Sequence, residues 1–241
     1  MVTNFHVLIQ PDKMKNVLFP LMVFSMFLIN GRVYSQKSVD FQKVYGSDPL
    51  LFNGKLYRFY AGLTKGTPFL FDKFNNGTIT LRGQVYEDQS INFDIYNRQL
   101  VLQYISESGG INRIIVSEAW LESFEVNGSV FEPVELGDSV PVLCKVLKTD
   151  QLKLVYELRK EMIMDNTISS TRMQFSSPIR INYLASRDKL HRYTNNRTFV
   201  SFFDEQHKQE LKKFLRKNRI NVKKSGDQEM MSLLTYCSQL I

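Results

Sequence analysis

The sequence predicts an α+β fold that is mainly antiparallel β, arranged as a meander or sandwich, with two C-terminal α-helices. Apolar and polar residues alternate at period two over most of the chain, which is typical of half-buried strands. Short turn sequences separate these stretches, as in an antiparallel meander. From about residue 204 onward the apolar residues follow a helical spacing instead. An apolar fraction of 43% and an aromatic fraction of 12% suffice for a folded core.

The beginning of the 241-residue chain has the charge pattern of a secretory signal. Lys13 and Lys15 precede the uncharged apolar run 17–29. That run is too short to cross a bilayer core of about 30 Å as a helix. A signal peptide is therefore expected, and an uncleaved N-terminal anchor helix is the alternative.

The end of this segment fits cleavage by signal peptidase. Ser35 is small, and Val33 stands two residues before it. We expect residues 1–35 to form the signal peptide, with residues 1–13 an upstream artefact if translation starts at Met14. The mature protein would then be periplasmic or extracellular, with association with the outer membrane as a further option.

The β-rich body is expected to cover residues 36–200, with a first meander over residues 36–136. Asn76-Gly77 and Asn127-Gly128 are predicted as tight turns, because this dipeptide suits the type I′ turn of a hairpin. Asn97-Arg98 is predicted as a third turn. Two strands are expected to place apolar residues on one face: Ile79, Leu81, Gly83 and Val85 in one, and Ile91, Phe93 and Ile95 in the next.

A second strand group is expected over residues 137–200, and a helical hairpin over residues 201–241. Residues 149–151 and 186–188 are predicted to join two hairpins of this group. Asp204 is expected to cap the first helix, which ends near Asn218, and Ser225 with Gln228 forms a possible capping box for the second. The first helix carries a narrow apolar stripe: Leu211, Phe214 and Leu215.

Several segments occur in an order that resembles a known group of proteins. They are LFNGKLYRFY, NNGTITLRGQVYED, INFDIYNRQLVLQY, INRIIVSEAWLESFEVNGSVFEPV and KQELKKFLRKNRINVKKSGDQEMMSLLTYC. Together they resemble a family of secreted β-rich proteins of Bacteroidetes bacteria that end in a lysine-rich helix and a short final helix. The resemblance covers most of residues 41–241 and implies a cell-envelope location. Its motifs are strand faces and turns, so it implies no activity and no functional residue.

The sequence contains few of the side chains that catalysis commonly needs. It has no nucleotide-binding glycine loop, no serine-hydrolase elbow and no zinc-protease motif. Past residue 35 the histidines are His191 and His207, which are not at metal-ligand spacing. We therefore expect a non-catalytic protein without cofactor or metal that binds another envelope component. The alternative is a carboxylate-dependent hydrolase acting on envelope polysaccharide, with acids drawn from Asp88, Asp94, Glu118, Glu122 and Glu125.

Aromatic residues of the first meander are one set of candidate binding residues. They are Tyr57, Tyr60, Tyr86, Tyr96 and Trp120. Exposed aromatic rings on a sheet stack on sugars or anchor protein partners. The alternative is that these rings fill the core and rim of the β body.

The basic segment LKKFLRKNRINVKK, residues 211–224, is the second candidate. It holds seven lysines and arginines and no acid, in a chain of formal net charge +7. Lys212, Lys213, Arg216 and Lys217 are the binding residues expected here. Their partner would be an envelope protein, a polysaccharide or an anionic lipid surface. A solvated helix face is the alternative, and secretion argues against nucleic acid.

The chain contains two cysteines, which could form a disulfide or remain free. Cys144 and Cys237 pair as a disulfide if the compartment is oxidising and the geometry permits, or they remain buried free thiols. After signal cleavage the protein is expected not to be an integral membrane protein.

Overall fold

The computed structural model describes residues 55–58, 64–106, 109–137, 140–165, 172–186 and 189–240. All of them belong to the unit that runs from Val39 to Ile241. The predicted signal peptide and Tyr60 lie outside the described residues.

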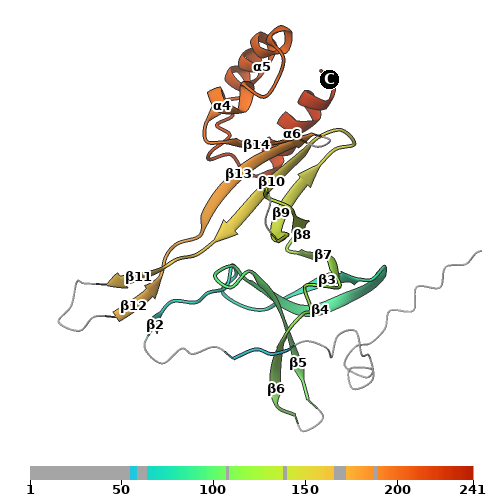
Figure 1. The fold of residues 1–241 in the computed structure, drawn as a ribbon, viewed down its shortest axis with the longest axis vertical. Coiled ribbons are helices and arrows are strands. Elements are labelled where there is room, and N and C mark those ends of the chain that lie inside the picture. Colours follow the sequence, from blue (N-terminus) through green and yellow to red (C-terminus); the bar gives the residue numbers. More distant parts are fainter. Residues whose placement is uncertain are drawn as a thin grey trace, which may run out of the picture. The chain divides into compact units, whose positions relative to one another are not determined.

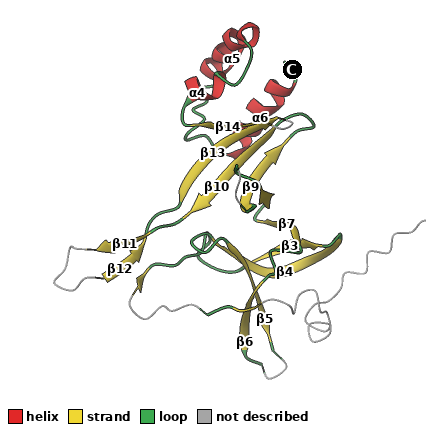
Figure 2. Ribbon diagram, in the orientation of Figure 1, coloured by secondary structure: helices red, strands yellow, loops and turns green. Residues whose placement is uncertain are grey.

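A single sheet of eleven strands dominates the described part of the chain (Figures 1 and 2). All its neighbouring strands are antiparallel, which confirms the predicted fold class. In spatial order the strands are β1 (Lys55–Leu56), β6 (Ile111–Ile115), β5 (Gln99–Ile105), β4 (Gln84–Asp94), β3 (Asn75–Leu81), β7 (Leu121–Val126), β8 (Ser129–Val134), β9 (Val142–Lys148), β10 (Lys153–Arg159), β13 (Ile179–Ser186) and β14 (Lys189–Tyr193).

The strands expected on either side of residue 136 are part of this one sheet, because β8 is hydrogen-bonded to β9. A second, small sheet contains β11 (Met162–Asp165), β12 (Arg172–Phe175) and β2 (Thr64–Lys65). In it, β12 and β2 run parallel. The predicted hairpins β9–β10 and β13–β14 are both present.

Two of the three turns predicted in the first meander are where the sequence placed them, and one is wrong. Asn127 and Gly128 join β7 to β8 with φ values of 51° and 69°, and residues 95–98 join β4 to β5. Asn76-Gly77 lies inside β3 instead, and the β3–β4 turn is formed by Arg82 and Gly83.

Close packing explains why Gly77 is needed away from a turn. A Cβ atom at this position would lie 2.3 Å from the carbonyl oxygen of Glu125, beside a register shift in the β3–β4 pairing. The displaced turn also changes the strand faces. Val85 is 53% exposed, whereas Ile79 and Leu81 are buried, so the prediction of one shared face is wrong for Val85.

Three helices are found in the described residues near the C-terminus: α4 (Asn196–Val200), α5 (Glu205–Lys217) and α6 (Asp227–Ser238). The bounds predicted for α5 are confirmed, since Asp204 precedes it and Asn218 follows it, but the Asp204 side chain makes no capping hydrogen bond. The cap predicted for α6 is wrong by one residue. The backbone N–H of Gly226 donates to the Glu229 carboxylate (3.2 Å), while Ser225 bonds within the preceding loop.

The short helix α4 was not predicted. Asn195 caps it by accepting a hydrogen bond from the Thr198 backbone N–H (3.0 Å).

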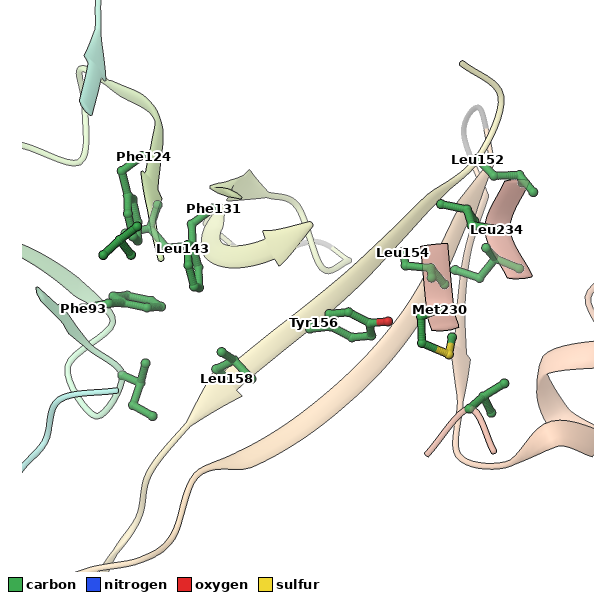
Figure 3. Close-up of a cluster of buried hydrophobic side chains, with 14 of the residues drawn as sticks. Phe93, Phe124, Phe131, Leu143, Leu152, Leu154, Tyr156, Leu158, Met230 and Leu234 are labelled. Carbon is green, nitrogen blue, oxygen red and sulfur yellow. The ribbon is translucent and has the colours of Figure 1, made fainter. Parts of the chain in front are cut away.

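The main hydrophobic core follows the inner face of the large sheet from the first meander to α6 (Figure 3). At one end Phe93, Phe124 and Phe131 pack together, and the last two stack with ring centroids 4.6 Å apart. At the other end Met230 and Leu234 of α6 lie against the β10 region (Figure 3). The helix α6 therefore closes one face of the C-terminal strands.

Candidate functional site

Seven exposed cations lie on α5 and the loop that follows it. We call them the basic surface: Lys212, Lys213, Arg216, Lys217, Arg219, Lys223 and Lys224. None forms an ion pair with another residue in the described part of the chain. The four residues predicted from the sequence are thus brought together with three more cations of the loop.

Packing of the opposite face of α5 fixes which residues point outward. Leu211 and Leu215 are buried in the main core, and the ring of Phe214 stacks on Tyr236 of α6 at 4.1 Å. This is the apolar stripe that the sequence predicted. Because the stripe is occupied by the core, the cations are left on the solvent side.

The loop from 218 to 226 is tied to the sheet by the side chain of Arg180. Its guanidinium donates to the carbonyl oxygen of Lys223 (2.7 Å) and, at 3.5 Å, to those of Val222 and Ser225. The guanidinium also lies over the Tyr156 ring, 4.9 Å from its centroid. A residue of β13 therefore holds the backbone that carries Lys223 and Lys224.

A second side chain holds the same loop from α4. The Asn196 amide donates to the carbonyl oxygen of Ile220 (2.8 Å) and accepts from the Val222 backbone N–H (2.9 Å). Ile220 and Val222 are themselves buried. With Arg180, this leaves the loop anchored at several points although it has no regular structure.

Two acids near the basic surface are paired with other cations, and a third is exposed on α5. Glu205 forms an ion pair with Lys208 (2.6 Å), which lowers the pKa of its carboxyl group. Asp227 forms an ion pair with Lys145 of β9. Glu210 is exposed, immediately precedes Leu211 and forms no ion pair among the described residues. The basic surface keeps a positive excess.

Two of the candidate aromatic residues lie in the interior. Tyr86 is 1% exposed and belongs to the main core. Tyr57 is in a separate cluster, where its hydroxyl donates to Asp94 (2.8 Å). Burial and the nearby Asp94 carboxylate raise the pKa of Tyr57.

Tyr96 and Trp120 are more accessible but are engaged by neighbours. Tyr96 packs edge-on against Phe175 at 5.2 Å, and the Arg82 guanidinium lies 4.1 Å from the centre of the Trp120 ring. The predicted aromatic residues that the structure describes therefore contact different neighbours and do not share one patch. Ligand binding by any of them stays a prediction.

The acids of the hydrolase hypothesis are distributed over several places. Asp88 and Glu125 line one pocket of about 300 Å³, together with Glu87. Glu118 lines a different pocket, and Glu122 accepts a hydrogen bond from the Gly83 backbone N–H (2.9 Å). Asp94 is buried under Tyr57. One pair of candidate carboxylates thus shares a pocket.

The pocket that contains Glu118 has a volume of about 930 Å³. Its walls are largely apolar, with Leu121 and Leu143 from the core and Pro133 from β8. Arg98 also lines it, but this guanidinium is already paired with the buried carboxylate of Glu157 (2.8 Å).

The two cysteines are buried, and each of the two described histidines is hydrogen-bonded to a neighbour. Cys144 lies in a small cluster on one face of β9, whereas Cys237 lies in the main core, and both are buried free thiols. Burial raises the pKa of each thiol to about 12, which disfavours the reactive thiolate. His191 is hydrogen-bonded to the Thr198 carbonyl oxygen (2.8 Å), and His207 to Gln206 (2.8 Å).

Within the described ranges, no three His, Cys, Asp or Glu side chains are grouped as metal ligands. No helix in the same ranges combines the length and apolar character that a membrane span requires.

Arg180 and Asn196 are the functional candidates that sequence reasoning missed. Their partners are backbone atoms 24 to 45 positions away in the chain. Such contacts leave no local pattern in the sequence.

Comparison of the chain with protein-family models, with curated proteins and with solved structures finds no match.

Proposed function

We propose that this is a non-catalytic, secreted or periplasmic protein of the cell envelope that binds another envelope component. The observation that carries the proposal is the basic surface, in which seven exposed cations have no ion-pair partner among the described residues. An anionic partner fits this charge.

The arrangement of the cations favours binding over a purely local role. Lys212 and Arg216, and likewise Lys213 and Lys217, are like-charged pairs four residues apart, which destabilise a helix by a few tenths of a kcal/mol. Arg216 and Lys217 do offset the helix dipole in the last turn. That effect does not account for the remaining five cations, three of which lie on the anchored loop.

Cell fractionation of tagged protein tests this function. We expect recovery with the envelope, and release of the protein into solution by high salt because exposed charges are screened. Changing Lys212, Lys213, Arg216 and Lys217 to Gln should abolish the association. Recovery from the cytosol with residues 1–35 intact would refute the proposal.

A matched variant separates a specific surface from net charge alone. It carries the same loss of charge at four exposed cations elsewhere, by changing Lys65, Lys73, Lys189 and Arg192 to Gln. This variant should still fractionate with the envelope. Equal loss of association in both variants would contradict a defined binding surface.

A carboxylate-dependent hydrolase of envelope polysaccharide is the second candidate. The observation in its favour is the pocket that Asp88 and Glu125 share. Release of reducing sugar from envelope polysaccharide is the assay. Activity that is lost in Asp88→Asn and in Glu125→Gln would replace the binding proposal, whereas no release by the wild-type protein would remove this candidate.

A further inference from the structure

We infer that the partner of the basic surface is the layer of phosphate groups on an anionic lipid bilayer, on which α5 and its loop lie without insertion. The inference rests on the proposed function and specifies its partner. It also assigns Arg180 as the residue that positions the loop half of the surface.

The absence of exposed apolar side chains on this surface argues against insertion. All residues from Asp204 to Gly226 are described, and none of their large hydrophobic side chains is exposed. A helix that inserts into a bilayer needs a free apolar face. In α5 that face is used by Leu211, Phe214 and Leu215 for packing inside the protein. The contact with lipid is therefore made by charge alone.

The same segment lacks the features of a sugar-binding surface. Its one aromatic residue is Phe214, whose ring is covered by Tyr236. Sugar-binding surfaces present open aromatic faces on which the sugar rings stack. The two pockets described above do not include any residue of the basic surface, and neither does a third pocket, which the β9–β10 turn lines. Cations on the outer side of a helix suit a broad planar array of phosphates better than a single chain in a groove.

The composition of the surface fits phosphate groups that move. Five of its seven cations are lysines. A lysine ammonium acts as a compact point charge with rotatable donors, whereas arginine favours fixed bidentate geometry. Mobile lipid headgroups do not offer fixed geometry. A surface rich in lysine can therefore follow them.

Arg180 determines where the loop cations are held. By donating to three carbonyl groups between Val222 and Ser225, it fixes the backbone on both sides of Lys223 and Lys224. Loss of these bonds would let the loop cations disperse away from those of α5. The surface would then keep nearly all its charge but lose part of its charge density.

Vesicle sedimentation with the mature protein tests the inference. The probes are vesicles of phosphatidylcholine alone and of phosphatidylcholine mixed with phosphatidylglycerol, each at low and at high salt. We expect binding only to the mixed vesicles, and only at low salt. Each basic residue near an anionic bilayer contributes a factor of about five in binding, so the Gln variant at Lys212, Lys213, Arg216 and Lys217 should bind on the order of several hundred-fold more weakly.

Single variants test the role of Arg180. Arg180→Gln and Arg192→Gln each remove one charge, and Arg192 is an exposed residue of β14 outside the basic surface. Arg180→Gln should weaken vesicle binding by several-fold more than Arg192→Gln. Circular dichroism at the binding temperature shows that each variant is folded. Equal effects of the two variants would overturn the positioning role.

A soluble polyuronate, whose charges are carboxylates, separates this inference from the proposed function. Binding to polyuronate but not to the mixed vesicles would overturn the lipid inference and leave the proposed function intact. Vesicle binding that resists high salt, or that survives in the quadruple variant, would also overturn it. The proposed function is decided separately, by the fractionation experiment.

Discussion

The helices α5 and α6 have nearly equal length, 13 and 12 residues, but they divide two tasks between them. Helix α6 buries Met230, Leu233, Leu234 and Cys237, and it has no basic residue in its last turn. Helix α5 buries two leucines and turns four cations outward. Stability is thus concentrated in α6, and the charge available to a partner is concentrated in α5. Substitutions in the two helices should therefore have different consequences.

The largest expected effect is on folding, from a truncation in α6. Leu234 is fully buried in the main core beside Leu154 (Figure 3). Leu234→Ala should lower the free energy of unfolding by about 2–5 kcal/mol, because it removes buried methyl groups and leaves a cavity. Urea denaturation measures the loss.

A neighbouring residue on the same helix serves as the control. Met231 is 38% exposed, and Met231→Ala should change the free energy of unfolding by less than about 0.5 kcal/mol. Similar losses in both variants would show that α6 does not close the core in the way described.

The second prediction concerns the contact that links the sheet to the loop between the helices. Arg180→Gln should lower the free energy of unfolding by about 1–3 kcal/mol, because carbonyl groups of the loop lose their charged donor. Arg192→Gln, at an exposed position, provides the control in urea denaturation. A loss confined to vesicle binding, without any loss of stability, would mean that water replaces the donor.

The third prediction uses the thiol that distinguishes α6 from α5. Burial raises the pKa of Cys237 from 9.0 to about 12. A group with a raised folded-state pKa contributes stability that is fully present below its unfolded pKa and is lost as pH rises through its folded pKa. Stability should therefore fall between pH 9 and pH 12.

A variant without the thiol isolates this contribution. Urea denaturation across the alkaline range should show a shallower decline for Cys237→Ala than for the wild type. The pKa of Cys144 is also raised to about 12, so the stability of the variant should still decline to some extent with rising pH. Identical slopes would exclude Cys237 as a source of the pH dependence.

Periodicity predicted the strands and the two longer helices because each depends on neighbours in the sequence. It failed where a distant segment sets the environment. Asn92 and Asp94 occupy the expected polar face of β4, yet both are buried. The Asn92 amide donates to the carbonyl oxygen of Phe71 (2.9 Å), and Asp94 accepts from Tyr57. Segments far from β4 in the sequence therefore cover a face that alternation alone assigned to solvent.

The sequence likewise predicted only part of the candidate site. The cations of α5 were identified because an unbroken basic run is visible in the sequence and the apolar stripe shows which side faces inward. The two side chains that anchor the loop, Arg180 and Asn196, were not identified, since they bind backbone atoms of the loop and these contacts leave no pattern in the sequence. The aromatic residues were ambiguous because the same rings suit a core and a surface, and only burial distinguishes the two.

The smallest expected effect on stability is that of the four charge changes on α5. Changing Lys212, Lys213, Arg216 and Lys217 to Gln relieves two like-charge pairs, each a few tenths of a kcal/mol, and removes a favourable dipole interaction of about 0.3–1 kcal/mol. These terms nearly cancel, so the thermal midpoint followed by circular dichroism should scarcely move, although vesicle binding falls steeply. A large drop in the midpoint would mean that these cations pair with acids in the folded protein. In that case the cations of α5 would stabilise the fold, as the buried residues of α6 do, and the proposal that the basic surface binds an anionic partner would be contradicted.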